Sequence, residues 1–324
     1  MLPEMPPARF NFCQKIANRC VVPEKGLWKM RSRFFSAASL STGIVLGLLL
    51  SLLVGPGFGA PLEIRVPTTG EGASRDAYQY RLLRLLLDKS GVDYRIQVVP
   101  MRFTQARVVV ELERGELINL YWMGTSPEME QRLLPVYFPV FKGLLGYRLF
   151  IIHKERQEDF ARVTSLAELR EMVGGQGIGW ADVAILEQAG LRQRQAPYDT
   201  IIGMVNADHL DYFSRAVTEI YPEVEEHARK YPDIRVEQRL LLYYPLAMFF
   251  FVSPKHPELA EALRRGVERA HADGSFDHFF YTYPAVRDAL DKANLDRRLR
   301  LEIPNPQLTD RTRRALERYR HILR

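Results

Sequence analysis

Short apolar segments that suit β-strands alternate with longer segments of helical periodicity from residue 62 onwards. Residues 62–67 and 94–99 have the character of strands, and residues 76–90 between them repeat apolar side chains at helical spacing until Gly91. This alternation predicts an α/β fold with mostly parallel sheets covered by helices. In the first half the expected strands are 62–67, 94–99 and 117–123, and the expected helices are 76–90 and 103–114.

The second half of the chain repeats this alternation and adds helix-start signals. Ser165 and Glu168 form a capping-box pattern, and Asp182 begins a helix that ends at Gly190. Pro245 interrupts the longest β-rich run, which therefore predicts two strands with a bend between them. That run is 234–253, and the other expected strands are 147–153 and 177–180. A long amphipathic segment, 219–230, follows 209–213, and the expected helices are 257–273 and 275–283, before a charged tail, 287–324.

A basic, then apolar, then small-residue pattern occupies the amino-terminal part of the chain. No charged residue lies between Arg33 and Glu63, and basic residues precede this uncharged stretch. Leucines and valines fill its middle, and glycines and an alanine follow them, which is the pattern of a secretory signal peptide. We therefore expect a signal peptide over residues 30–60, cleaved within 57–61, and a protein that is exported to the periplasm.

The same amino-terminal region allows a second interpretation. Residues 34–54 are long and apolar enough to span a bilayer, so an uncleaved membrane anchor is the alternative. Residues 1–29 precede an ordinary signal-peptide start and are expected to be a mis-called extension of the chain. Both cysteines, Cys13 and Cys20, lie in that extension, so the exported part can form neither a disulfide nor a cysteine-ligated metal site.

Length and charge narrow the class of the exported part. About 265 residues remain after residue 60, which is enough for one large or two modest α/β domains. The full chain has a formal charge of +6, but most of this excess lies in the leader, so the exported part is nearly neutral. A nearly neutral protein gives no electrostatic reason to expect a nucleic-acid partner.

Three stretches, in this order, carry a resemblance to a known family. The segment 100–103, Pro-Met-Arg-Phe, follows the second strand, and the segment 123–126, Met-Gly-Thr-Ser, is followed by Arg132 and Phe138. Near the end, 272–276 reads Ala-Asp-Gly-Ser-Phe. From about residue 62 to 283 the chain resembles the type 2 periplasmic solute-binding proteins, in particular the amino-acid-binding family 3.

The resemblance implies two lobes that are joined by two hinge crossings and hold a ligand between them. Gly143 and Gly146 stand where the first crossing is expected, and glycines suit positions whose backbone angles must change. An ordinary glycine-containing loop is the alternative. By this resemblance lobe 1 comprises 61–144 plus 247–324, lobe 2 comprises 147–244, and the crossings lie at 143–148 and 244–247.

In such a fold the loops after the strands and the helix amino termini face the ligand. Phe103 falls on the aromatic wall of the family, although Phe103 and Trp122 would suit core packing equally well. The lobe 1 candidates are Thr69, Arg75, Phe103, Trp122, Gly124, Thr125 and Ser126.

Arg132 matches the arginine that holds the α-carboxylate of the ligand in the family, a bidentate pair that suits a guanidinium. Two extra residues separate Arg132 from Thr125 when compared with the spacing in the family. The alternative is therefore an arginine that is displaced from the site and solvated.

Lobe 2 contributes three candidates, of which Arg215 is the most informative. Trp180 lies in a glycine-rich turn that lacks the spacing of a dinucleotide-binding loop, so no cofactor is expected. Ala216 stands where amino-acid-binding members carry an Asp for the ammonium group, and Arg215 precedes it. Arg215 thus favours an anionic ligand; the alternative is a structural ion pair with Glu219, which is itself the third candidate.

These features together predict an extracytoplasmic solute-binding protein for a small anionic or amino-acid-like metabolite. We expect a monomer whose partners are this small molecule and an inner-membrane permease or sensor. A sensory or accessory module without a transporter is the alternative. The usual catalytic and metal-site motifs are absent, so no enzyme and no metal are expected, although a dehydratase that uses Glu219 or Asp182 remains a further alternative.

Overall fold

The structure is a computed structural model that describes residues 60–67, 77–100 and 104–319. All of the described residues belong to one compact unit, 59–324. The expected extension, 1–29, and nearly all of the expected signal peptide lie outside the described residues. Within the described ranges, no helix combines the length and apolarity that crossing a membrane requires.

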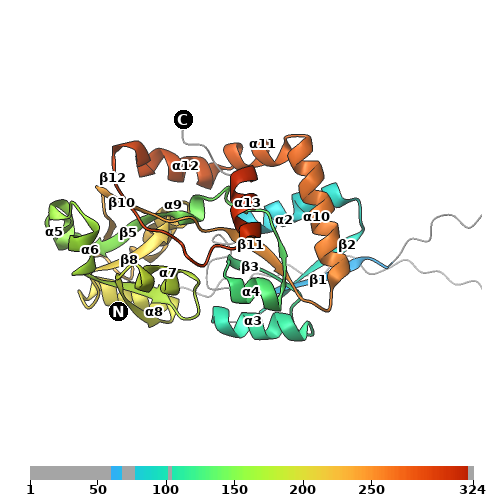
Figure 1. The fold of residues 1–324 in the computed structure, drawn as a ribbon, viewed down its shortest axis with the longest axis horizontal. Helices are drawn as coiled ribbons and strands as arrows, with labels where there is room; N and C mark the ends of the chain where they lie inside the picture. Colours follow the sequence, from blue (N-terminus) through green and yellow to red (C-terminus); the bar gives the residue numbers. More distant parts are fainter. Residues whose placement is uncertain (1–59, 68–76, 101–103, 320–324) are drawn as a thin grey trace, which may run out of the picture. The chain divides into compact units, whose positions relative to one another are not determined.

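Lobe 1 is built on a three-stranded sheet and a separate parallel pair of strands (Figure 1). Strand β11 lies between β3 and β4 and is antiparallel to both, whereas β1 and β2 are parallel. Helices α2 and α10 pack against each other, and α3 packs against β3. The bounds are β1 Leu62–Pro67, β2 Tyr94–Val99, β3 Leu120–Gly124, β4 Leu134–Val136, β11 Met248–Val252, α2 Ala77–Ser90, α3 Gln105–Arg114, α4 Pro127–Arg132, α10 Pro257–Ala272 and α11 Ser275–Thr282.

Lobe 2 is built on a seven-stranded sheet with the order β12-β10-β5-β8-β6-β7, in which β9 also pairs with β5. Strand β6 is parallel to β7 and β8, whereas β5 is antiparallel to β8, β9 and β10. The bounds are β5 Tyr147–His153, β6 Val173–Gly177, β7 Arg192–Ala196, β8 Tyr212–Ala216, β9 Ile234–Val236, β10 Leu240–Tyr243, α5 Gln157–Arg162, α6 Leu166–Arg170, α7 Asp182–Gln188, α8 Tyr198–Asn206 and α9 Val217–His227.

The α/β class and the two-lobed architecture are confirmed, and the strand pairing is mixed. Arg148 at the start of β5 pairs with Ala216 at the end of β8, and Met248 at the start of β11 pairs with Gly124 at the end of β3. Strands β5 and β11 each begin beside a crossing, where β8 and β3 end. Strands β5 and β11 therefore run antiparallel to β8 and β3. The alternation of strands and helices along the chain, taken alone, predicts parallel pairs instead.

The two crossings lie against each other and are joined through their backbones. The Tyr244 N–H donates to the Gly146 carbonyl at 3.2 Å. A Cβ atom on Gly146 would lie 2.0 Å from the Tyr244 carbonyl oxygen, so only glycine allows this approach. Gly143 adopts a φ of 85°, in the left-handed region that favours glycine. The local backbone geometry thus explains why glycine occupies both Gly143 and Gly146.

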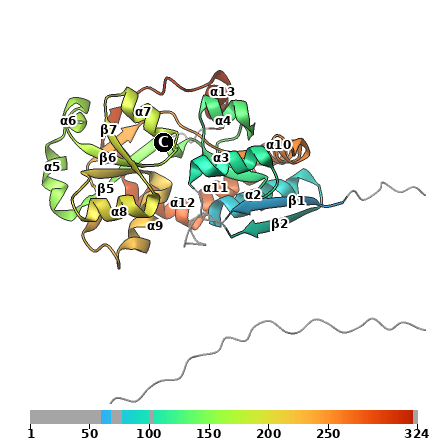
Figure 2. The same ribbon diagram turned by 90° about the horizontal axis from the view of Figure 1, so that it is seen from below.

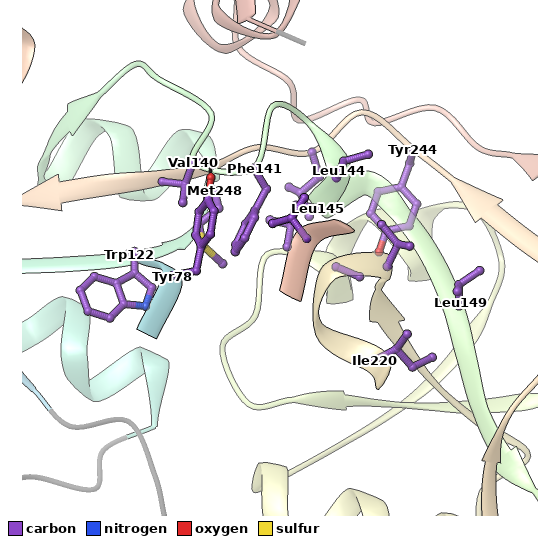
Figure 3. Close-up of a cluster of buried hydrophobic side chains, with 14 of the residues drawn as sticks. Tyr78, Trp122, Val140, Phe141, Leu144, Leu145, Leu149, Ile220, Tyr244 and Met248 are labelled. Carbon is purple, nitrogen blue, oxygen red and sulfur yellow. Dashed lines mark hydrogen bonds between the residues drawn. The ribbon is translucent and has the colours of Figure 1, made fainter. Parts of the chain in front are cut away.

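A buried cluster of apolar and aromatic side chains lines this crossing region (Figure 3). The Tyr78 ring stacks on Phe141 with a centroid distance of 4.5 Å, and the Tyr78 hydroxyl donates to the Val140 carbonyl at 2.9 Å. Leu144 and Leu145 continue the cluster toward Tyr244 on the second crossing. This packing holds the start of α2 against the first crossing.

Most of the expected charged tail is folded, as α12 Pro284–Ala293, β12 Leu299–Glu302 and α13 Asp310–Tyr319. Strand β12 pairs with β10 in the lobe 2 sheet, although all of 247–324 was expected in lobe 1. The chain then passes to α13, where the hydroxyls of Thr309 and Thr312 donate to Glu130 in lobe 1 at 2.8 and 2.6 Å (Figure 1 and Figure 2). Residues 303–309 therefore form a third connection between the lobes.

Candidate ligand-binding site

A cavity of about 340 Å³ lies at the ends of β3, β6 and β8, beside the first crossing. This volume falls in the range of small-molecule sites. The first lobe and the carboxy-terminal segment contribute Tyr78, Gln79, Trp122, Gly124, Tyr283 and Val286 among others; the second contributes Arg148, Trp180, Asp182, Tyr198, Asp199, Arg215, Thr218 and Glu219 among others.

Arg215 near the end of β8 lies in the wall of this cavity and is only 4% exposed. Its Nε and Nη2 atoms donate to the two carboxylate oxygens of Glu223, both at 2.6 Å, and Nη2 lies 3.0 Å from Glu219. Burial alone would lower the pKa of Arg215, but these carboxylates raise it above its ordinary value. The alternative of an ion pair with Glu219 is thus present and is joined by a second, closer pair.

Aromatic rings surround the guanidinium of Arg215. Its Cζ atom lies 4.7 Å from the Trp180 ring centroid, 5.1 Å from that of Phe213 and 5.7 Å from that of Tyr198. Such contacts attract a cation to the face of a ring. The expected place of Trp180 in the cleft agrees with the cavity lining, and its ring is also part of the packing that holds Arg215.

Arg148, at the second position of β5, is a cavity residue that the sequence reasoning missed. It is 1% exposed; its Nε donates to the Tyr244 hydroxyl at 2.9 Å, and its Nη2 pairs with Asp182. Its Nη1 lies 3.9 Å from Glu219. Burial alone would lower the pKa of Arg148, but Asp182 and its neighbours raise it. A lone charge in an apolar strand next to an expected crossing was the available signal.

Carboxylates outnumber arginines in the cavity wall. Asp182, Asp199 and Glu219 line the cavity together with Arg148 and Arg215, and the buried Glu223 adds a further negative charge beside Arg215. Asp199 lies in the first turn of α8 and has no hydrogen bond or ion pair with the other described residues. The described wall therefore carries a net negative formal charge, whereas Arg215 in the sequence favoured an anionic ligand.

Two further polar atoms in the wall lack partners among the described residues. They are Oε1 of Gln79, a residue that is 5% exposed at the start of α2, and Oγ1 of Thr218 at the start of α9. A buried acceptor without a donor is unusual in a folded protein. No local sequence signal marks these two residues, because only the packing of α2 and α9 brings them to one cavity. Within the described ranges, no group of three or more His, Cys, Asp or Glu residues is arranged to hold a metal ion.

The lobe 1 candidates separate into those in the wall and those outside it. Trp122 and Gly124 line the cavity. Trp122 is also buried, so it both borders the cavity and packs in the core. Thr125 and Ser126 are not in the lining: the Thr125 hydroxyl donates to Glu130, and the Ser126 hydroxyl caps α4. Thr69, Arg75 and Phe103 lie outside the described residues.

Arg132 is not in the cavity lining and is tied to carboxylates elsewhere on lobe 1. Its Nε and Nη2 atoms donate to Glu113, both at 2.7 Å, and its Nη1 donates to Glu128 at 2.6 Å. The hydrogen bonds that Arg132 donates to Glu113 and Glu128 raise the pKa of Arg132 above its ordinary value. Arg132 is the last residue of helix α4, and its side chain bonds to Glu113 and Glu128 instead of lining the cavity. Arg132 is therefore displaced from the site, which is the alternative that its extra spacing from Thr125 had indicated.

Comparisons with known proteins extend only to fold. No family model and no curated protein matches the sequence. An ancestral arginine-binding protein bound to arginine is 14% identical, with a TM-score of 0.51 over 68% of this chain and 98% of that one. A Streptococcus pneumoniae amino acid ABC transporter substrate-binding protein bound to L-arginine is 13% identical, with a TM-score of 0.50 over 69% and 94%.

A third similar structure is a His/Glu/Gln/Arg/opine family-binding protein from Silicibacter pomeroyi in complex with lysine. It is 13% identical, with a TM-score of 0.50 over 68% of this chain and 96% of that chain. The fold expected from the resemblance is therefore confirmed as that of the periplasmic amino-acid-binding proteins.

Proposed function

We propose that this chain is an extracytoplasmic solute-binding protein that holds a small, amino-acid-like metabolite between its lobes. The cavity carries the proposal, because residues of both lobes line it at strand ends and helix starts. Sites of this kind in open α/β sheets lie at the carboxyl ends of the strands. The arginine and lysine bound to structures of similar fold support a solute of this size.

Capture proceeds by closure of the lobes about the crossings. The Gln105 Nε2 in lobe 1 donates to the Gly179 carbonyl in lobe 2 at 3.1 Å, so the described arrangement already has a bond across the site. Opening breaks this bond, and the backbone changes occur at the glycine-containing crossing. A solute that contacts both lobes stabilises the closed form, because it loses its contacts with one lobe when the lobes separate.

The signal-peptide pattern supports export to the periplasm, where a monomer would deliver the solute to an inner-membrane permease or report it to a sensor. The protein binds its solute without converting it. Asp182 and Glu219, the carboxylates that a dehydratase would use, are each paired with a buried arginine. This pairing favours a fixed recognition surface over proton transfer.

Thermal unfolding in the presence of candidate solutes tests the proposal. A solute at 100 times its dissociation constant adds about 2.7 kcal/mol to the free energy of unfolding, which raises the melting temperature measurably. We expect such a rise with at least one member of a panel of amino acids, amines and carboxylates, together with a smaller radius of gyration by small-angle scattering. A panel without any rise would contradict solute capture.

A further inference from the structure

We infer that the solute is a small organic cation that the cavity recognises through an ammonium or guanidinium group, by the carboxylates of Asp199 and Glu219. The inference rests on the proposed function and names the ligand class of the same cavity. It reverses the anionic ligand that Arg215 favoured in the sequence.

The two arginines of the wall are already engaged. Arg215 uses Nε and Nη2 for Glu223 and Glu219, and its guanidinium lies against aromatic rings. Arg148 uses Nε, Nη2 and Nη1 toward Tyr244, Asp182 and Glu219. An anionic ligand at either guanidinium would compete with the carboxylate that is already paired there, and the buried carboxylate would lose part of its compensation.

The carboxylates of the wall have capacity left. Asp199 makes no hydrogen bond or ion pair with the other described residues, and it lines the cavity from the first turn of α8. Glu219 is partly exposed, and its Oε2 atom accepts from the Ala216 N–H and lies near both arginines. Within the described part of the chain, no bond to its Oε1 atom is found. A cation placed between these two carboxylates would offset the excess negative charge of the wall.

The unpaired polar atoms of the wall also suit a donor. The Gln79 amide oxygen is a buried acceptor that lacks a donor among the described residues, and the Thr218 hydroxyl oxygen can accept as well. Gln79 lies in lobe 1 and Thr218 in lobe 2, so N–H groups of one ligand could bond to both lobes. A ligand with several N–H donors would satisfy atoms that the protein alone leaves without partners.

The described wall offers little to a carboxylate. Its lining contains no lysine among the described residues, its arginines are engaged, and Arg132 is held outside by Glu113 and Glu128. Recognition should therefore depend on the cationic group, and the loss of a carboxylate from the ligand should cost little affinity.

Calorimetric titration of the protein with four probes of similar length tests this inference. The probes are 1,5-diaminopentane, L-lysine, 5-aminopentanoate and glutarate, which differ mainly in the number and sign of their charges. We expect 1,5-diaminopentane and L-lysine to bind within about tenfold of each other, and glutarate to bind at least about a hundredfold more weakly. Tighter binding of glutarate, or of L-lysine by more than about tenfold over the diamine, would overturn the inference.

Two variants identify the carboxylates involved. Asp199→Asn, at an exposed position, should weaken binding of 1,5-diaminopentane by about tenfold, and Glu219→Gln should weaken it by at least as much. Glu113→Gln is the control, because Glu113 lies outside the cavity lining, and it should leave the affinity unchanged. Unchanged binding in both Asp199→Asn and Glu219→Gln would overturn the site.

The outcomes also separate this inference from the proposed function. If glutarate or another anion raises the melting temperature while both cations fail, solute capture stands and the cationic class is wrong. If no compound of any charge raises the melting temperature, solute capture fails and the ligand class fails with it.

Discussion

Two arginines of this chain make the same bidentate pair with a glutamate in very different surroundings. Arg215 pairs with Glu223 at 2.6 Å, and both side chains are almost fully buried. Arg132 pairs with Glu113 at 2.7 Å, and each of these side chains is about one third exposed. The geometry is matched, so the two pairs isolate the effect of burial at the scale of single residues.

Removal of the glutamate should therefore cost much more at the buried pair. Glu223→Ala leaves a buried guanidinium with half of its partners, and we expect the free energy of unfolding to fall by about 3–5 kcal/mol. Glu113→Ala leaves a solvated arginine, and we expect a loss of no more than about 1 kcal/mol. Urea unfolding of both variants measures the difference; equal losses would contradict the burial argument.

At the scale of elements, the closest helix packing is that of α2 against α10. A Cβ atom built on Gly266 of α10 would lie 1.9 Å from the Leu86 carbonyl oxygen of α2. That neighbour is backbone and cannot turn away. Gly203 in the interior of α8 provides the contrast, because its nearest contact is the Tyr231 hydroxyl at 3.2 Å.

The same substitution should thus have opposite effects in the two helices. Gly266→Ala forces α2 and α10 apart, and we expect a loss of about 1–3 kcal/mol in the free energy of unfolding. Gly203→Ala reduces the freedom of the unfolded chain in a helical position, and we expect an effect between none and a gain of about 1 kcal/mol. Thermal and urea unfolding compare them, and similar losses in both would show that the Tyr231 contact at Gly203 yields no better than the backbone contact at Gly266.

Several elements were predicted well because their signals are local. The capping box at Ser165 and Glu168 is present, and Gly91, Gly115 and Gly190 adopt positive φ after their helices. The expected strand over 177–180 is a turn instead, because the buried strand β6 ends at Gly177. The glycines of β6 are typical of a loop in the sequence. They form a strand here because β7 and β8 pair with β6 on its two sides.

At the scale of the whole molecule, the lobes come into contact at the cavity. A Cβ atom on Gly124 would lie 3.7 Å from the Cβ atom of Ala181, and these two residues belong to different lobes. This separation fits the Cβ spacing of a disulfide. The only cysteines of the chain, Cys13 and Cys20, precede residue 60, so no native cysteine lies in the rest of the chain to compete with an introduced pair.

A pair of cysteines should therefore lock the closed form. With Cys13 and Cys20 changed to serine, Gly124→Cys together with Ala181→Cys should form a disulfide under mild oxidation, detected by mass spectrometry. The oxidised protein should neither admit nor release solute, and reduction should restore exchange. Each single cysteine variant is the control. A thiol pair that stays reduced under oxidation would show that the lobes do not meet in solution.

The sequence alone determined the features that depend on near neighbours in the chain. Hydrophobic periodicity, capping residues and glycine stops act within a few residues, so the α/β class and most element positions follow from them. The resemblance added the two-lobed arrangement and placed Trp122, Gly124, Trp180, Arg215 and Glu219, all of which line the cavity.

Only the tertiary structure decided which charges face one another. Arg132 and Arg215 look alike in the sequence, yet helix α4 carries one to Glu113 and strand β8 brings the other beside Glu223. The third connection, through residues 303–309, was likewise hidden, because a charged tail reads as solvated until β10 and Glu130 supply its partners. Side-chain charge is a local property, but its partner is set by the meeting of elements distant in the chain.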